Sequence, residues 1–405
     1  MTNYDVIKDT RILISGAGVA GLTTAYWLKQ YGFSPTIIER ASALPTGGYK
    51  IDVRGSALQV LRKMGIYNAV ATAGTDMQGA ILVDKKGRTI GKMSGDAFGH
   101  RTGDDLEILR GNLCQILMDQ IPDVEIIFGD NIQNISQYTD KVEVTFQKNK
   151  SREFDFVVGA DGLHSNTRQI VFGDEAQFSH ELGLYLCVYT VPNYLNLDRL
   201  EMQYSELGRV AAIWSSRGES TAKACFGFTA PTKIDLNDRV QQQQDLKKIY
   251  EGIDWEVPRL FQLMPDSPDF YFDAAAQIHM DQWHNNRVVL LGDAAYCASP
   301  MSGQGTSLAI IGAYILAGEL AVASGNHQVA FNEYELQMRH FVKLNQALGI
   351  TAANTMKSQG KNNFIIWVLM KLMRMMPGSL IKFIINLSTK RINQAANAIV
   401  LKNYK

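Results

Sequence analysis

Three glycines near the N-terminus have the spacing of a loop that binds a dinucleotide. Gly16, Gly18 and Gly21 follow the apolar segment 11–15, which is typical of a buried strand, and the chain then continues in a helical pattern. In such a loop the first glycine permits a tight turn, the second lets the backbone approach a pyrophosphate, and the third lets the helix pack against the strand. We therefore predict a nucleotide-binding unit here; a purely structural glycine turn is the alternative.

An acidic residue follows the next predicted strand at the distance that this unit requires. Glu39 lies 18 residues after Gly21 and ends the strand-like segment 35–38. The carboxylate that contacts the ribose hydroxyls is expected about 20 residues after the glycines, and it favours a free ribose diol over a ribose phosphate. Glu39 and its neighbour Arg40 are therefore predicted to contact the cofactor, and the alternative for Glu39 is a surface charge at a strand end.

A second segment of acid and glycines lies far along the chain, where the apolar segment 287–291 leads to Asp293. Four further residues of this segment are predicted to contact a cofactor: Pro300, Gly303, Gln304 and Gly305. We expect Asp293 to accept hydrogen bonds from ribityl hydroxyls, and the helix that starts here to direct its positive end toward a flat ring. A dinucleotide contacted by two distant segments indicates FAD. For Asp293 alone, a helix N-cap is the alternative.

The composition limits the classes of protein to which this chain can belong. Its 405 residues are 46% hydrophobic and 20% charged, and the formal net charge is zero without an extended basic run. We therefore expect no nucleic-acid partner. The four cysteines lie far apart without a C-x-x-C pair, and the seven histidines lack metal-binding spacing. We predict neither a metal site nor a disulfide framework.

Two segments bear on the compartment of the protein. The N-terminal residues lack the basic and apolar regions of a secretion signal, so we expect a cytoplasmic location. The apolar stretch 364–385 is interrupted by Lys371, Arg374 and Pro377. A membrane span needs about 20 uninterrupted apolar residues, so we expect no stable membrane insertion. The favoured interpretation is an amphipathic helix pair packed on the protein, and attachment to a membrane interface is the alternative.

The order of the predicted elements indicates an α/β protein with an inserted sheet. Three segments are predicted to form a Rossmann-like FAD-binding domain: 1–75, 99–179 and 274–327. Two segments contain short β-branched and aromatic strands that predict an inserted antiparallel-sheet domain for the substrate: 76–98 and 180–273. Residues 328–405 are helical in pattern and form a predicted C-terminal helical extension.

Five motifs, taken in this order, resemble those of the class A flavoprotein monooxygenases of the p-hydroxybenzoate hydroxylase type, over about residues 10–325. They are Gly16-x-Gly18-x-x-Gly21, Glu39-Arg40, Arg110, Asp161-Gly162 with His164-Ser165 and Arg168, and Gly292-Asp293 with the segment Pro300 to Gly305. The resemblance implies that Arg110 and Asp161 lie beside FAD and that Asp52 approaches the flavin. The alternatives are a solvated side chain for Arg110, a tight turn for Asp161 and a surface turn for Asp52.

The resemblance also implies the reaction. NADPH is expected to bind transiently, since no second glycine-rich loop follows a later strand. Reduced flavin then reacts with O2 to give a C4a-hydroperoxide, which hydroxylates the substrate. Because the flavin performs the oxygen transfer, we expect no catalytic side chain.

Four segments are similar to the tetracycline destructases, flavin monooxygenases that hydroxylate and so inactivate tetracycline antibiotics: 51–55, 107–111, 191–195 and 292–297. The similarity implies five substrate-binding residues: Arg209, Cys225, Phe226, Phe228 and Met301. Arg209 is expected to meet the polar edge of the drug. Cys225, Phe226 and Phe228 are candidates for an apolar wall, although only alternate residues of a strand can face a pocket, and the sheet core is their alternative.

The similarity further implies that segment 364–385 is a substrate lid, with a plain packing helix as the alternative. The histidine with which the family contacts its substrate has no counterpart here. We expect a monomer that takes a small tetracycline-like molecule and O2. Two alternatives stay open: the same chemistry on another phenolic or polyketide substrate, and a non-oxygenating flavin-binding module that interacts with a partner.

Overall fold

A six-stranded sheet lies at the centre of the domain that contains the glycine loop. In the computed structural model the described residues are 10–44, 48–230, 232–358 and 389–404. The strands lie in the order β17-β18-β11-β1-β2-β7, and all neighbours are parallel except β17 with β18. Their bounds are Arg11–Ser15 (β1), Ser34–Glu39 (β2), Glu125–Phe128 (β7), Phe156–Gly159 (β11), His284–Asn285 (β17) and Val288–Leu290 (β18). The carboxyl ends of the parallel strands share one edge, where open α/β sheets bind ligands.

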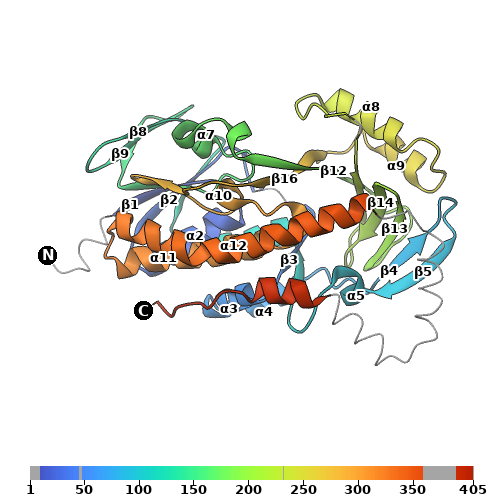
Figure 1. Cartoon of the computed structure of the whole chain (residues 1–405), viewed down its shortest axis with the longest axis horizontal. Helices are drawn as coiled ribbons and strands as arrows, with labels where there is room; N and C mark the ends of the chain where they lie inside the picture. Colours follow the sequence, from blue (N-terminus) through green and yellow to red (C-terminus); the bar gives the residue numbers. More distant parts are fainter. Residues whose placement is uncertain (1–9, 45–47, 231, 359–388, 405) are drawn as a thin grey trace.

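Different layers cover the two faces of this sheet (Figure 1). Helices cover one face, namely α2 (Val19–Gln30), α11 (Gly305–Val322) and α12 (His327–Ser358). A three-stranded antiparallel sheet covers the other, namely β8 (Ile132–Gln137), β9 (Val142–Phe146) and β10 (Arg152–Phe154). Alternate residues of β1 divide between the layers, because successive strand residues point to opposite faces. Ile12 and Ile14 belong to the helical core, and Leu13 to the core under β9.

Helix α11 runs through the helical layer. Among the described residues it is the one helix long and apolar enough to cross a membrane, but 78% of it is buried inside the protein. It contacts α2, α12 and α3 (Ser56–Lys63). A helix that is apolar on every side is expected in the core of a large protein, and this burial identifies α11 as a core helix.

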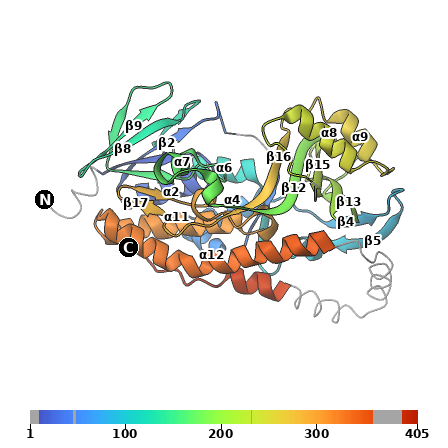
Figure 2. The ribbon, with the colours of Figure 1, turned by 45° about the horizontal axis from the view of Figure 1, so that its top comes forward.

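A second, seven-stranded sheet forms the other part of the molecule, in the order β16-β12-β15-β14-β13-β4-β5. The strands are β4 (Gly79–Val83), β5 (Thr89–Ser94), β12 (Ser179–Pro192), β13 (Leu200–Glu206), β14 (Arg209–Ser215), β15 (Thr221–Phe228) and β16 (Tyr271–Ile278). Helices α8 (Arg239–Ile249) and α9 (Val257–Leu263) lie on one face, as Figure 2 shows. The sequence predicted the sheet, including β4 from the earlier segment, but not these two helices.

Two strands of the seven-stranded sheet run without a break through the predicted domain boundaries. The boundaries predicted at 179/180 and 273/274 fall inside β12 and β16, which pair with each other along most of their length. The edge of the domain therefore has no linker at these points. A two-stranded sheet, β3 (Lys50–Val53) with β6 (Leu106–Leu109), lies beside the junction. Further helices are α4 (Tyr67–Thr72), α5 (Gly95–Gly99), α6 (Arg110–Met118), α7 (Asn166–Phe172) and α10 (Asp293–Tyr296), with short 3-10 turns η1 (Glu175–Gln177) and η2 (Pro300–Ser302). Residues 389–396 are also helical.

The C-terminal residues return along α11. A Cβ atom added at Gly318 would lie 2.2 Å from the ring of Tyr404, and the Tyr404 hydroxyl donates a hydrogen bond to Glu319 at 2.7 Å. The predicted α/β fold class, with a Rossmann-like domain, an antiparallel sheet and C-terminal helices, is confirmed. The predicted lid segment, 364–385, lies outside the described residues.

Candidate active site

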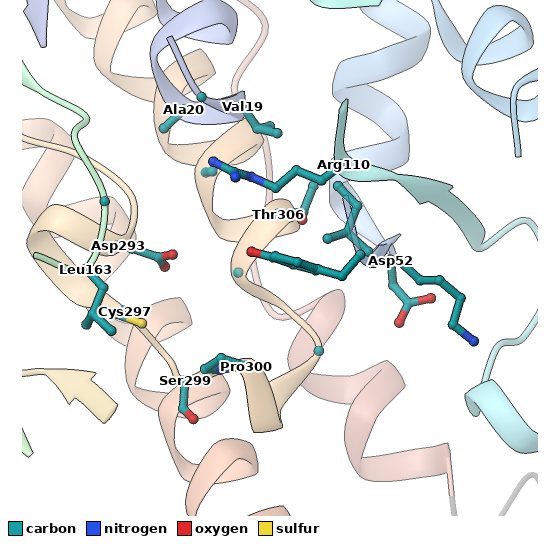
Figure 3. Close-up of a pocket in the computed structure, with 18 of the residues that line it drawn as sticks. Val19, Ala20, Asp52, Arg110, Leu163, Asp293, Cys297, Ser299, Pro300 and Thr306 are labelled. Atoms are coloured by element: carbon teal, nitrogen blue, oxygen red, sulfur yellow. The ribbon is translucent and has the colours of Figure 1, made fainter. Parts of the chain in front are cut away.

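Two connected cavities follow the carboxyl edge of the parallel sheet. The larger, of about 320 Å³, extends from the glycine loop to α11, and Figure 3 shows its lining; the smaller, of about 280 Å³, extends from the loop to the end of β2. Four residues line both cavities: Gly18, Arg110, Ala160 and Gly162. The two spaces therefore form one elongated groove, with Glu39 at one end and Asp293 toward the other.

The three glycines of the loop have separate structural roles. Gly16 has a φ of +102°, and an added Cβ would lie 2.6 Å from the carbonyl oxygen of Ala160. At Gly21 an added Cβ would lie 1.9 Å from the carbonyl oxygen of Gly16, so the helix can approach the loop only if this residue is glycine. At Gly18 the nearest atom would be Nη2 of Arg110 at 3.5 Å, so the space beside Gly18 opens into the groove. This division matches the functions of turn, ligand approach and packing.

The acid at the end of β2 is tied to the loop. Glu39 accepts hydrogen bonds from the backbone N–H groups of Ala17 and Ala41, both at 2.8 Å. The predicted pair, Glu39 and Arg40, lines the smaller cavity. The carboxylate is thereby held at the place where a ribose diol would need an acceptor.

Arg110 begins α6 and reaches across the centre of the groove (Figure 3). Its backbone N–H donates to the carbonyl of Tyr49 at 3.1 Å, and this bond fixes the start of the helix to the loop before β3. A cation at a helix N-terminus opposes the macrodipole. Arg110 lines both cavities, and a pyrophosphate bound between them would need a positive charge. This need explains why a cation stands at the start of α6.

The second acid-and-glycine segment forms the far wall. Asp293 projects into the larger cavity, and Pro300, Gly303 and Gly305 line it together with the first turn of α11. Added Cβ atoms at Gly303 and Gly305 would lie 3.9 Å from Asp52 and 3.7 Å from Asp293, within the space that a ligand would use. Burial raises the pKa of Asp293, although a hydrogen bond with Cys297 and the charge of Arg110 act to lower it.

Gln304 differs from its neighbours. Its side chain is fully buried, neither amide atom has a hydrogen-bond partner, and it does not line either cavity. The predicted contact of the Gln304 side chain with the cofactor is therefore not seen in the described geometry.

Asp161 stabilises the loop that follows β11. It accepts hydrogen bonds from Thr167 N–H at 2.9 Å and from the hydroxyls of Ser165 and Ser15, and it lines the smaller cavity. Arg168, which has no exposed side-chain surface, donates to the carbonyl of Ala294 at 3.0 Å. The Asp161 motif and the Asp293 motif are thus joined by a buried arginine.

His164 connects this loop to the seven-stranded sheet. Its ring nitrogens lie 2.8 Å from Glu175 and 3.1 Å from Asp273 of β16. These two carboxylates raise the pKa of His164 to about 10, against the effect of burial. The imidazole is therefore protonated at neutral pH and links the two sheets by charge.

The groove fits FAD by its shape and by its donor set. It supplies an acid for a ribose at one end, a glycine loop with a helix N-terminus and an arginine for phosphates in the middle, and an acid for ribityl hydroxyls further along. Gly18, Gly303 and Gly305 leave the backbone accessible where side chains would fill the groove. The residues that would hold FAD are those predicted from the sequence except the side chain of Gln304.

The substrate residues predicted on β14 and β15 need correction. Phe226 and Phe228 are buried and pack against Tyr250, the residue that follows α8, in the core between the sheet and its two helices. Arg209 is the cross-strand partner of Phe228 and donates to the carbonyl of Ile249 at the end of α8. These three residues therefore point away from the groove. The prediction was wrong because the helices that cover this face were not recognised.

Cys225 lies on the opposite face of β15, as alternation requires. It pairs with Val188 of β12, which in turn pairs with Tyr271, a residue of the larger cavity. Met301 packs in a small apolar cluster with Leu184 and does not line the cavity. Cys225 therefore stays a predicted substrate contact. Met301 stays a predicted contact only because it follows Pro300, which does line the cavity.

Several lining residues were missed by the sequence analysis. Tyr49 and Tyr271 come from different elements, and their rings lie 6.0 Å apart inside the larger cavity. Lys50 and Thr306 also line it. Tyr49 follows the predicted loop at Gly48, and that position was a usable indication. Nothing in the sequence places Tyr271 there, since it depends on the pairing of β16 with β12.

Comparison with known proteins agrees with this site. The family model of the FAD binding domain matches residues 9–340. A flavin-dependent monooxygenase of Legionella longbeachae serogroup 1 (strain NSW150) is 41% identical over 345 residues, which are 85% of this chain and 88% of that protein. The crystal structures of the tetracycline destructases Tet(55) and Tet(51) each superpose with a TM-score of 0.85 at 35% identity. They cover 97% and 98% of this chain, and 98% and 100% of their own chains. The chain therefore belongs to the FAD-binding-domain family, among its flavin-dependent monooxygenases.

Proposed function

We propose that this enzyme consumes NADPH and O2 to hydroxylate, and so inactivate, tetracycline antibiotics. The observation that supports the proposal most is its similarity to two tetracycline destructases over nearly the whole chain, at 35% identity. In the balanced reaction NADPH and a proton reduce O2, one oxygen atom enters the substrate and the other leaves as water. Bound FAD, once reduced, supplies the electrons that activate O2.

The chain's own part in this reaction is to bind and orient. Arg110, the glycine loop and Asp293 would hold the cofactor along the groove. The face of the seven-stranded sheet opposite α8 would hold the substrate, because it adjoins the larger cavity through Tyr271. We call this the substrate-facing surface; it includes Val188, Val210, Trp214, Lys223, Cys225 and Tyr271.

One observation favours the second candidate, the same chemistry on another phenolic or polyketide substrate. Arg209, the expected partner of the polar edge of tetracycline, lies on the helix-covered face of the sheet. A different residue must then recognise polar substrate atoms, and the substrate range can differ with it.

The proposal is tested with purified, FAD-loaded protein. NADPH absorbance is followed with and without chlortetracycline, and the product is examined by mass spectrometry. Drug-stimulated NADPH oxidation with the gain of one oxygen atom in the drug is expected. If NADPH is oxidised without loss of any tetracycline, and other polyphenols are converted, the second candidate function replaces the first. Parallel assays with NADH establish which reductant is preferred.

A further inference from the structure

A group of buried and half-buried charges lies where β3 faces the seven-stranded sheet. Its members are Lys50, Asp52, Arg54, Arg101, Glu107 and Glu201. Lys50, Asp52 and Arg54 come from β3 and the turn after it, whereas Glu201 belongs to β13 of the other sheet. The ion pair between Lys50 and Glu201, with an N–O distance of 2.6 Å, therefore connects the cofactor groove to the substrate-facing surface.

The charges in this group divide into pairs. Arg101 lies 2.6 Å from Glu107, and Arg54 lies 2.8 Å from Asp52. Glu107 is 4.0 Å from Lys50, so its main partner is Arg101. Lys50 is thus left with one close carboxylate, Glu201, and an ammonium group has three N–H donors.

The surroundings keep Lys50 charged. Burial lowers the pKa of this lysine, but the carboxylates of Glu201 and Glu107 raise it, and the net direction is upward. The ammonium also lies 4.8 Å from the centre of the Trp214 ring, and Trp214 is on the substrate-facing surface. A cation above an indole is held by the ring's electrons as well as by its carboxylate.

Lys50 also reaches the place where a substrate would lie. The residue lines the larger cavity, next to Asp52 and Tyr49. Across from it, Cys225 accepts a hydrogen bond from the indole N–H of Trp214 at 3.1 Å and is only partly buried. Among the described residues Lys50 makes one hydrogen bond, to Glu201, so two of its three N–H groups are left for a ligand between β3 and this face. Lys50 belongs to the strand beside the flavin end of the groove.

We propose that Lys50 determines substrate specificity: its ammonium group binds an ionised enol or phenol oxygen of the substrate, while Glu201 and Trp214 hold the ammonium in place. This inference rests on the proposed function, because it assumes that the substrate lies on the substrate-facing surface. It assigns to Lys50 the recognition of the polar edge that Arg209 cannot reach. The substrate class is then a polycyclic phenol or β-diketone whose oxygen loses its proton near neutral pH.

The test compares two substitutions that break the same ion pair. Lys50→Met removes the cation, and we expect the dissociation constant for chlortetracycline, measured by quenching of protein fluorescence in FAD-loaded enzyme, to rise roughly 10- to 100-fold. Glu201→Gln keeps an amide oxygen that still accepts a hydrogen bond from the ammonium, so the cation stays in place, but it removes the competing negative charge, and binding of the anion should become tighter. Lys50→Arg should retain most of the affinity. If Lys50→Met and Glu201→Gln weaken binding equally, the pair is only structural and the proposal is wrong.

A matched control comes from another lysine. Lys141 forms an ion pair with Glu153 at the same distance, 2.6 Å, on the sheet that contains β9, far from the groove. Lys141→Met should leave the dissociation constant unchanged. The FAD content and the melting temperature of each variant show whether it folds. If Lys50→Met does not fold, the affinities of Lys50→Arg and Glu201→Gln, compared with the wild type, still test the proposal.

A second probe separates this inference from the proposed function. Alizarin is a phenolic dye whose colour changes when it ionises, and its binding requires no turnover. If Lys50 binds a phenolate, the wild-type protein should lower the apparent pKa of bound alizarin, and Lys50→Met should abolish the shift. This result would support Lys50 even if no tetracycline is oxidised. An equal shift in both proteins, or no binding of alizarin and chlortetracycline to the wild type, would overturn the inference.

Discussion

The carboxylate of Glu39 accepts a hydrogen bond from the backbone N–H of Ala17, with an N–O distance of 2.8 Å. The end of β2 and the glycine loop after β1 are thus joined by a charged acceptor. This contact holds the loop in shape and also fixes the acid beside the smaller cavity.

The first prediction concerns this contact. Glu39→Ala removes the acceptor of two backbone donors and the acceptor that we propose for the ribose, and hydrogen bonds to charged groups contribute about 1.5–3 kcal/mol each. We expect the dissociation constant for FAD to rise at least roughly tenfold, measured by titration of the apoprotein with flavin fluorescence. Glu153→Ala, an exposed acid that pairs with Lys141 and lines neither cavity, serves as the control. An unchanged FAD affinity in Glu39→Ala would show that the acid does not contact the cofactor.

The second prediction concerns Asp293. Asp293→Ala should yield protein with little bound flavin, because the variant lacks the acceptor that we propose for the ribityl hydroxyls. The raised pKa of Asp293 adds a pH dependence: FAD affinity should fall as the pH is lowered through a value above the ordinary 3.8 of the carboxyl group, since the protonated acid is a poorer acceptor. Absorbance of the purified variant in the visible region provides the measurement. A fully yellow Asp293→Ala protein would contradict the assignment.

The third prediction uses the pH dependence of His164. Its pKa is raised from 6.5 to about 10 by Asp273 and Glu175, so its contribution to stability is complete below pH 6.5 and is lost as the pH rises through about 10. His164→Gln should therefore lower the melting temperature near pH 6 and have no effect above pH 10. Because half of the side chain is exposed, the effect should not exceed about 1 kcal/mol. An equal change at both pH values would exclude the ionic link.

The fourth prediction separates the two faces of β15. Phe226→Ala removes a buried aromatic side chain from the core under α8 and α9 and should destabilise the protein by about 3–5 kcal/mol. KM for the substrate, measured per FAD-loaded molecule, should stay the same. Cys225→Phe, on the opposite face, should raise KM with a small change in melting temperature. A specific rise of KM in Phe226→Ala would restore this residue to the substrate site.

The fifth prediction concerns the proposed lid. The C-terminal residues pack on α11 through Tyr404 and Glu319, so a simple truncation would remove this packing as well. An internal deletion of residues 364–385 that keeps 389–404 is the sharper variant. We expect KM for chlortetracycline to change more than FAD content does. Unchanged kinetics would reject the lid.

The sequence by itself determined the cofactor end of the site. Gly16, Gly18, Gly21 and Glu39 lie close together along the chain, and the strand, turn and helix that carry them are local structures. Asp293 follows the same kind of strand-end turn. Local backbone requirements limit these positions to glycine: Gly16 has a positive φ, and Gly21 has no room for a Cβ. The pattern can therefore be recognised in the sequence alone.

Only the tertiary structure decided the substrate end. Whether Arg209, Cys225 or Phe226 faces the groove depends on which side of the seven-stranded sheet α8 and α9 cover, and alternation along a strand gives two faces without saying which is inside. Likewise, Lys50 and Glu201 are 151 residues apart in sequence and meet because β3 lies beside β13 at the junction of the two sheets. Such contacts arise from long-range packing, and no local spacing in the chain encodes them.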